Sequence, residues 1–422
     1  MKIFCTSDGR PLGDVSETKL SSVSDFIGNP STLKNADDFV MGLRNELRNH
    51  AEKYASLLSA ETGNPITWCR EEINETVRSL DSWNKHGYNS EEKVKLLNSR
   101  FHAIFEMIPA PFTLVIGSKI APLLNFVVHF LSSLETGSRL IYSPSKYGSL
   151  TLSSLWEDVS EGPQMSFLPL FSNHEGSNFR NILANAGRMR IIFRGTDESM
   201  HVLLRKAPVH LTIDEKIQSV AVVLDGDTDL IARSIASSLR WVKDTMFSPK
   251  RVLVKEELLE YMFNAVSEES YRLRFGDPCD SLTDLPGFMS STDRDAFIED
   301  IAQEKNQWNT LHSDPEIIGN SSSPAILKVE DKFGPFWNRG PFWPFLVMKG
   351  IKSVDEAFGM LRNEQRAIVL YSEDVGIVKK FLSSGFNIIS NPPAFISAAE
   401  YLSLESCSKE YLLERRNVFY WS

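Results

Sequence analysis

The chain is poor in cysteine and lacks the histidine pairs that metal sites use. Its 422 residues include four cysteines, Cys5, Cys69, Cys279 and Cys407, which are far apart in the sequence. No two histidines are spaced four residues apart. Zinc sites are usually built from closely spaced pairs of these residue types. The sequence therefore predicts no metal site, and its few scattered thiols favour a reducing compartment.

Long apolar runs and basic stripes are missing as well. The longest membrane-like stretch, residues 121–131, falls far short of the roughly 20 apolar residues of a spanning helix. The N-terminal residues carry too short an apolar run for a signal peptide. The net charge of −10 disfavours nucleic acid as a partner, because phosphate backbones are anionic too. We expect a cytoplasmic protein, with the nucleus as a second location.

The sequence does contain alternating apolar strands and amphipathic helices. Residues 112–117 form a continuous apolar run that is typical of a buried parallel strand. A helical pattern follows over residues 122–135, and residues 139–142 read as a second strand. The same alternation returns over residues 220–266 and 345–382. This pattern predicts an α/β fold with parallel sheets and right-handed crossovers.

Other segments carry more specific expectations. The apolar spacing predicts one long amphipathic helix over residues 36–62, stopped by Gly63, and a second helix over residues 71–83. Residues 85–99 are polar and are expected to form a loop, and residues 101–108 a strand.

A short tandem duplication, GPFWNR followed by GPFWPF, begins at residue 334. It is compatible with an aromatic binding surface. It is also compatible with a loop and a buried strand in which Trp337 and Trp343 are packing residues. We favour packing, because large aromatic side chains are highly buried on average.

Several motifs occur in an order that points to one family. They are ETGNP at residues 61–65, PAPFTLVIGSKIAPLLN at 109–125, LETGSRLIYSPS at 134–145, FRGT at 193–196, VAVVLDGDTDL at 220–230, FSPKRVLV at 247–254 and GPFWPFLV at 340–347. In order and spacing they resemble the aldehyde dehydrogenase family, most closely its short class that includes the fatty aldehyde enzymes. The family oxidises aldehydes to acids with NAD(P), so the resemblance implies this cofactor.

The resemblance also implies a domain organisation. Residues 1–97 and 109–210 would form a Rossmann-type cofactor-binding domain, and residues 211–392 an α/β catalytic-type domain. In the family, a hairpin and a C-terminal strand exchange between subunits. Residues 98–108 and 393–422 would supply these oligomerisation elements, with 417–421 as the strand. We therefore expect a homodimer or a hetero-oligomer with a related dehydrogenase.

The positions that the family uses for chemistry are substituted. A cysteine thiolate attacks the aldehyde carbon in the family, and the resemblance places Met246 at that position. A thioether has no proton to lose and cannot form a thiolate. The asparagine that holds the oxyanion corresponds to Ile120, which donates no hydrogen bond, and the tryptophan before it corresponds to Lys119.

The sequence leaves two interpretations of the segment that would carry the general base. The glutamate of the family falls in the stretch DEKIQ at residues 214–218, so Asp214 or Glu215 is a candidate base. A charged surface loop explains these acids equally well, and we favour the loop.

The cofactor positions are also altered. The lysine that binds the adenosine ribose corresponds to Ser143. Gly195 and Thr196 could still present N–H groups to a phosphate, whereas Met200 replaces the last glycine of that turn. The glutamate that holds the nicotinamide ribose corresponds to Trp337, or to Asp331 if the upstream copy of the duplication is used.

Three functions are therefore compared. The first is a catalytically inactive protein on the aldehyde dehydrogenase fold, with a structural or regulatory role, and we favour it. The second is an active NAD(P)-dependent oxidoreductase with an atypical site. The third is a nucleotide-sensing module supported by Gly195 and Thr196 alone.

Overall fold

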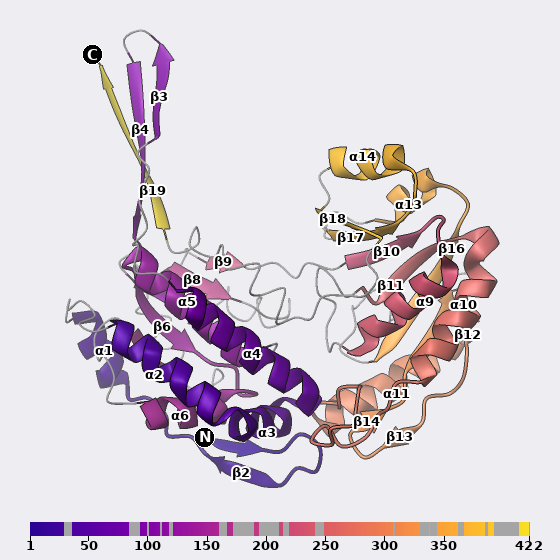
Figure 1. Cartoon of the computed structure of the whole chain (residues 1–422), viewed down its shortest axis with the longest axis horizontal. Coiled ribbons are helices and arrows are strands. Elements are labelled where there is room, and N and C mark those ends of the chain that lie inside the picture. Colours follow the sequence, from indigo (N-terminus) through magenta and orange to yellow (C-terminus); the bar gives the residue numbers. More distant parts are fainter. Residues whose placement is uncertain are drawn as a thin grey trace.

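The computed structural model describes the protein in two lobes and a projecting three-stranded sheet (Figure 1). It describes residues 1–28, 36–83, 93–98, 101–109, 112–117, 121–159, 167–171, 190–193, 211–213, 219–240, 249–306, 309–329, 337, 344–361, 367–384, 387–391 and 413–421. The first lobe is built on a five-stranded sheet and the second on a seven-stranded sheet. None of the described helices combines the length and the apolar character that a membrane crossing requires.

The first lobe carries a parallel sheet with the strand order β7-β6-β5-β8-β9. Its strands are β5 (Phe112–Ile116), β6 (Arg139–Ser143), β7 (Phe167–Pro169), β8 (Arg190–Phe193) and β9 (Leu211–Ile213). The order runs outward from β5 in both directions, as in doubly wound folds. An antiparallel hairpin of β1 (Lys2–Phe4) and β2 (Pro11–Asp14) precedes this sheet in the chain.

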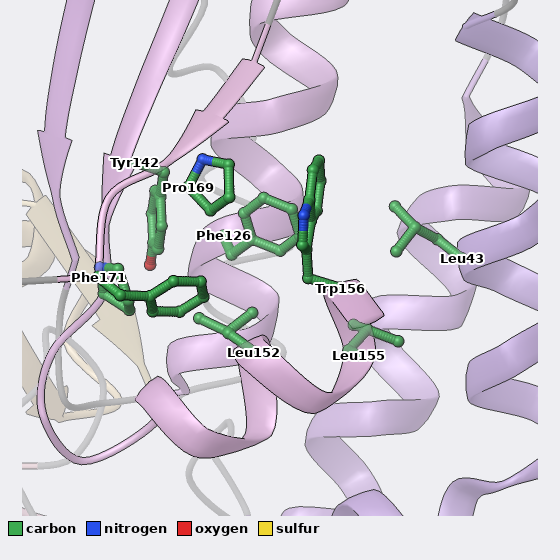
Figure 2. Close-up of a pocket in the computed structure, with 9 residues that line it drawn as sticks. Leu43, Phe126, Tyr142, Leu152, Leu155, Trp156, Pro169 and Phe171 are labelled. Carbon is green, nitrogen blue, oxygen red and sulfur yellow. The ribbon is translucent and has the colours of Figure 1, made fainter. Parts of the chain in front are cut away.

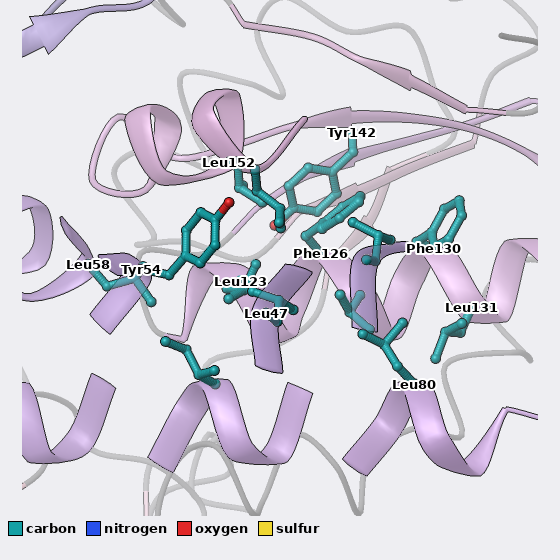
Figure 3. Packing of buried hydrophobic residues seen from close by; sticks show 14 of the residues in the cluster. Leu47, Tyr54, Leu58, Leu80, Leu123, Phe126, Phe130, Leu131, Tyr142 and Leu152 are labelled. Atoms are coloured by element: carbon teal, nitrogen blue, oxygen red, sulfur yellow. The ribbon is translucent and has the colours of Figure 1, made fainter. Parts of the chain in front are cut away.

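Helices cover both faces of this sheet. One face packs against five helices, α2 (Ala36–Asn49), α3 (Ala51–Thr62), α4 (Ile66–Ser82), α5 (Pro122–Thr136) and α6 (Ser149–Val159). Figure 3 shows the core between them, where side chains from α2, α3 and α4 meet those of α5 and β6. The other face packs against α1 (Leu20–Gly28) through Val23 and Phe26. The apolar run of β5 reflects this burial on two sides.

The second lobe carries the strand order β12-β15-β16-β11-β10-β17-β18, parallel except for the edge strand β12. Its strands are β10 (Ser219–Val223), β11 (Arg251–Lys255), β12 (Thr310–Leu311), β15 (Ala325–Val329), β16 (Phe345–Ile351), β17 (Ala367–Tyr371) and β18 (Asn387–Ser390). A small hairpin joins β13 (Ile317–Ile318) to β14 (Ser321–Ser322).

Two groups of helices cover the seven-stranded sheet. Helices α9 (Thr228–Ser237) and α10 (Glu256–Tyr271) pack on one face, and the short helix η1 (Ser238–Arg240) follows α9. The other face carries α11 (Ser291–Asn306), α13 (Val354–Met360) and α14 (Val375–Ser383). The alternation of strands and helices that the sequence predicted over residues 220–266 and 345–382 is confirmed.

The projecting sheet joins the C-terminal strand to two strands that precede β5 in the chain (Figure 1). It consists of β3 (Lys93–Asn98), β4 (Phe101–Pro109) and the C-terminal β19 (Leu413–Trp421). Strand β4 is central, and both of its neighbours are antiparallel to it. The tail thus pairs with the hairpin of its own chain, from Leu413 opposite Pro109 to Trp421 opposite Phe101.

Two sequence-based predictions are wrong in detail. Residues 36–62 form two helices because the backbone of His50 leaves the helical conformation, with φ −125° and ψ 30°. The apolar spacing continues in step across this break, so periodicity alone does not reveal it. Residues 85–99 were expected to be a loop, yet residues 93–98 form β3, because cross-strand pairing with β4 outweighs their polar composition.

Candidate functional site

The C-terminal ends of β5 and β6 form the described part of the candidate site. Ligands of parallel α/β sheets bind in the crevice at this edge. Strand β5 leads into Gly117, and β6 leads into the turn that begins at Pro144. Gly117 donates its N–H to the carbonyl of Ser143 at 2.8 Å, and the ring of Tyr142 covers the position where a side chain at Gly117 would lie. The glycine is therefore required by the close approach of Tyr142.

Tyr142 ties this edge to helix α5. Its hydroxyl donates to Oδ1 of Asn125 at 2.9 Å, and both residues are buried. Residue Ala121, just before α5, adopts a left-handed conformation with φ 43° and ψ 58°. This conformation is unusual for a residue with a Cβ and costs about 1–2 kcal/mol. Helix α5 is thus preceded by a strained residue.

A buried carboxylate holds the start of helix α5. Oε1 of Glu72, on α4, accepts the backbone N–H groups of Leu123 at 2.7 Å and Leu124 at 3.2 Å. Burial raises the pKa of Glu72 to about 7, and the two backbone hydrogen bonds oppose this rise. The positive end of the α5 dipole is thus satisfied from inside the protein.

A second buried carboxylate holds the start of helix α6. Glu61, on α3, accepts the N–H of Leu150 at 2.8 Å, the N–H of Thr151 at 2.8 Å and the hydroxyl of Thr151 at 2.5 Å. Burial raises its pKa to about 7 against the effect of these three donors. Sequence reasoning missed both acids. Glu72 could have been found, because it lies on the apolar face of its helix beside Cys69 and Ile73.

An apolar cavity lies beneath the same edge, between β6, α5 and α6 (Figure 2). Its volume is about 20 Å³, and the side chains around it include Phe126, Tyr142, Trp156 and Phe171. This is the size of about one water molecule, but the walls offer no polar partner. The cavity is therefore a gap in the packing of the core and does not hold a ligand of useful size.

The structure places only part of the predicted site. Ser143 ends β6 and is fully buried. Trp337 is buried in the core of the second lobe, so its packing role is confirmed. Its carbonyl oxygen accepts a hydrogen bond from the Nε–H group of Arg251 at 2.7 Å. The remaining candidates lie outside the described residues: Met246, Ile120, Lys119, Asp214, Glu215, Gly195, Thr196, Met200, Asp331 and Trp343.

The start of β11 lies just after the position of Met246 in the sequence and is rich in buried charge. Lys250 and Arg251 expose 0% and 1% of their surfaces. The ammonium of Lys250 donates to the carbonyl of Ser238, the residue that ends α9. The guanidinium of Arg251 holds the carbonyl of Trp337. These cations bind backbone oxygens and support the sheet.

The three described cysteines lie elsewhere, around the turn between α3 and α4. The thiol of Cys69 is 3.9 Å from the carbonyl oxygen of Asn64, and Pro278, the residue before Cys279, accepts the N–H of Ile66 at 2.8 Å. Burial raises the pKa of both thiols. Within the described residues, no group of three or more His, Cys, Asp or Glu side chains is arranged to hold a metal ion.

The described residues include only part of the predicted cofactor site, because Gly195 and Thr196, its phosphate-binding candidates, lie outside them. Ser143, which the family resemblance places at the ribose-binding position, has a neutral and fully buried side chain. The two helix N-termini at this edge, of α5 and α6, already bind the carboxylates of Glu72 and Glu61. Neither is free to receive a phosphate or hydroxyl of a dinucleotide.

The fold and the ordered motifs define an α/β protein of dehydrogenase type. The family model of the aldehyde dehydrogenase family matches residues 31–382, so the chain belongs to this family. It is 23% identical over 418 residues to lactaldehyde dehydrogenase of Methanococcus maripaludis strain C5, covering 90% of this chain and 85% of the relative. The chain is also 23% identical over 383 residues to lactaldehyde dehydrogenase of Methanococcus vannielii, a match that covers 84% of this chain and 79% of the relative.

Solved structures share the fold. The NADP complex of glyceraldehyde-3-phosphate dehydrogenase from Methanocaldococcus jannaschii superimposes with a TM-score of 0.82 at 14% identity, over 100% of both chains. Lactaldehyde dehydrogenase from Escherichia coli gives a TM-score of 0.81 at 12% identity, over 100% of this chain and 96% of that one. At these identities the likeness shows the fold alone.

Proposed function

We propose that this protein is a catalytically inactive member of the aldehyde dehydrogenase family with a structural or regulatory role. The observation that carries the proposal is the distribution of thiols. The position of the family's nucleophile holds Met246, and the three described cysteines lie around the turn between α3 and α4. Cys407 follows the segment that matches the family model.

The proposed inactivity follows from the chemistry of the substituted positions. A hemithioacetal needs a thiolate, and Met246 cannot supply one. Ile120 cannot donate to the oxyanion, and the loss of one such donor lowers the rate by about 10²- to 10³-fold. Because both changes act on the same step, ordinary turnover should be negligible.

A turnover assay with matched variants tests this proposal. The purified full chain is incubated with NAD or NADP and a panel of aliphatic aldehydes, lactaldehyde included, and reduced cofactor is followed by absorbance. We expect no turnover above the rate without protein. The double variant Met246→Cys/Ile120→Asn measures whether these two positions alone limit activity. Aldehyde-dependent reduction of cofactor by the unmodified chain would overturn the proposal.

An active oxidoreductase with an atypical site is the second candidate. The names of the relatives favour it, because curated relatives that match most of the chain are lactaldehyde dehydrogenases. In that case Asp214 or Glu215 would act as the general base. Turnover that is abolished in Asp214→Asn or Glu215→Gln, with unchanged thermal stability, would support this function.

A nucleotide-sensing module is the third candidate, supported by Gly195 and Thr196. Isothermal titration with NAD and NADP distinguishes this function from the inactive structural or regulatory protein. Binding without turnover would favour nucleotide sensing, and the absence of binding heat at millimolar cofactor would exclude it.

The oligomeric state belongs to the same proposal. We infer a homodimer, or a hetero-oligomer with a related dehydrogenase, from the family resemblance of the hairpin and tail. The sheet β19-β4-β3 supports this inference because it projects from the first lobe (Figure 1). A monomeric mass in light scattering would contradict it.

A further inference from the structure

The turn between β1 and β2 contacts both lobes through Thr6, which is 6% exposed. The N–H and the hydroxyl of Thr6 both donate to the carbonyl of Ala60, on α3 of the first lobe, at 2.9 Å and 3.2 Å. The carbonyl of Thr6 accepts a hydrogen bond from Nδ2 of Asn320, in the second lobe, at 2.6 Å. A single residue is therefore bonded to both lobes.

Both partners of the bond between Thr6 and Asn320 are anchored in the core of a lobe. Ile3 and Val15, on either side of the N-terminal turn, are buried in the core of the first lobe. Asn320 lies between β13 and β14, and its carbonyl accepts the N–H of Phe288 at 2.6 Å. Phe288 is buried in the core of the second lobe. A change in the relative position of the lobes must therefore stretch or break this bond.

Two further hydrogen bonds link the lobes at the turn between α3 and α4. The N–H of Gly287 donates to the carbonyl of Gly63 at 2.9 Å, and the N–H of Ile66 donates to the carbonyl of Pro278 at 2.8 Å. Ile66 is the first residue of α4, so its N–H has no acceptor within the helix. Together with the bond between the N-terminal turn and the second lobe, these two bonds form what we call the interlobe joint.

The bonds of the interlobe joint lie close together in space. A Cβ at Gly63 would lie 3.0 Å from the hydroxyl oxygen of Thr6. A Cβ at Gly287 would lie 3.0 Å from the carbonyl oxygen of Asn320 and 3.8 Å from that of Gly63. Because each glycine touches the partner of a neighbouring bond, stretching one bond displaces the next. We therefore expect the bonds to break and form together.

A cavity of about 230 Å³ lies beside the interlobe joint. Thr6, Ser7 and Asp8 line it from the first lobe, and Asp277 and Asn320 line it from the second. Side chains leave this space between the lobes unfilled, whereas each lobe has its own buried apolar core. Segments held by hydrogen bonds beside open space separate at a lower free energy than a packed core does.

We propose that the interlobe joint opens and closes as one unit while both lobes stay folded, and that the side chain of Asn320 sets how often it opens. The bonds of Gly287 and Ile66 join backbone groups, whereas the third bond uses the Asn320 amide, so a substitution can act on the joint there. Opening frees the lobes to turn relative to each other, as in hinge motions. The joint acts in this way whether or not the chain turns over aldehydes, so its test is separate from the turnover assay.

Amide-resolved hydrogen exchange of the full chain tests the proposal. The N–H groups of Ile66 and Gly287 report on the joint, because each donates across it. In Asn320→Ala we expect both to exchange about fivefold faster than in the unmodified protein, as the loss of one hydrogen bond predicts. The N–H of Leu114, buried in β5 of the first lobe, should keep its exchange rate.

Two results would overturn the proposal. An unchanged rate at Ile66, with faster exchange only at Phe288, whose N–H donates to Asn320, would mean that Asn320 acts locally. Equal acceleration at Ile66 and Leu114 would mean that the joint does not open separately from the lobes.

Ser321→Ala is the matched control. It removes the hydroxyl oxygen that accepts the N–H of Gly276 at 3.0 Å, a bond within the second lobe beside the same cavity. Ile66 should exchange as in the unmodified protein, and acceleration equal to that in Asn320→Ala would contradict the role of Asn320. Gly287→Ala is a second test that keeps Asn320, since the added Cβ would press on its carbonyl oxygen. Exchange at Ile66 should be faster there too, and an unchanged rate would contradict opening as one unit.

Discussion

At the helix ends described above, the two lobes use buried charges of opposite sign, although the second lobe also buries the carboxyl groups of Asp300 and Glu304 on α11. In the first lobe, the carboxylates of Glu61 and Glu72 receive the N–H groups at the starts of α6 and α5. In the second lobe, the cations of Lys250 and Arg251 donate to backbone carbonyls, one of them at the end of α9. Anions at helix starts and a cation at a helix end are each favoured by the helix dipole.

This difference shows that the buried charges serve the framework. Three of them hold or belong to segments that follow, in the sequence, positions that the family resemblance assigns to chemistry. Glu72 holds the helix after position 120, Glu61 holds the helix after Ser143, and Lys250 comes four residues after position 246. The framework residues keep charges that satisfy the backbone. Under the proposed function, Met246, Ile120 and Ser143 lack the groups that the family chemistry needs, and the fold would persist without that chemistry.

The largest expected effect is on the cationic side of the comparison. Arg251→Ala removes a large side chain that is 1% exposed and leaves the carbonyl of Trp337 without this donor. The cavity and the unsatisfied oxygen together should lower the free energy of unfolding by about 4 kcal/mol. Urea unfolding of the variant and the unmodified protein measures this difference in free energy. Arg272→Ala, at an exposed ion pair with Glu269, is the control and should change stability by less than about 1 kcal/mol.

The buried carboxyl groups of Glu61 and Glu72 should make the stability of the protein depend on pH. The pKa values of Glu61 and Glu72 are raised from 4.5 to about 7 by burial. Between pH 4.5 and about pH 7, the folded state therefore binds more protons than the unfolded state. The stability contributed by each group is thus present below pH 4.5 and is lost as the pH rises through 7. The loss should be about 3 kcal/mol per carboxyl.

Urea unfolding at about pH 5 and about pH 8 measures this slope. Glu61→Gln and Glu72→Gln each remove one titrating group, so each should flatten the slope by about half. Carboxyls with a lowered pKa, such as Glu52 beside Arg70 and Asp158 beside Lys53, titrate below this window and do not interfere. A slope that is identical in the unmodified protein and both variants would show that these glutamates stay ionised when buried.

The fold was accessible from the sequence because its strands are buried on two faces. The apolar runs of β5 and β10 identify them as strands without knowledge of their neighbours. By contrast, β3 is a polar strand that exists through its pairing with β4. The break at His50 is equally hidden, because the apolar stripes of α2 and α3 remain in step.

The candidate site was less accessible, since its polar contacts join distant segments. Glu61 reaches residue 151 and Glu72 reaches residue 123, separations that periodicity does not detect. The sequence also gave no sign that Cys5, Cys69 and Cys279 lie around one turn, because hydrogen bonds between distant segments, from Thr6 to Ala60 and from Ile66 to Pro278, bring them there. The family resemblance located Ser143 at the end of β6, where the structure has it.

A smaller effect is expected where the two capped helices approach each other. A Cβ at Gly148 would lie 2.6 Å from Cβ and 2.8 Å from Cγ of Pro122, the first residue of α5. Because neither atom can move without its helix, Gly148→Ala should lower stability by about 2 kcal/mol. Gly359→Ala is the control, since it lies in helix α13 with nothing within 4 Å of the added methyl. It should raise stability by about 0.5–1 kcal/mol in the same thermal unfolding experiment.

The smallest expected effect is the loss of stability when a tyrosine hydroxyl is removed, which should differ between a buried tyrosine in the first lobe and an exposed one in the second. Tyr142→Phe leaves Oδ1 of the buried Asn125 without its 2.9 Å hydrogen bond, which should cost about 1–2 kcal/mol. Tyr261→Phe removes a 2.5 Å bond to Asp229 at an exposed position in the second lobe, where water replaces the lost partner. Its cost should stay below about 0.5 kcal/mol. Equal losses for the two variants in urea unfolding would mean that water reaches Asn125. The edge of β5 and β6 would then be open to solvent and to ligands, contrary to the closed edge that the buried carboxylates describe.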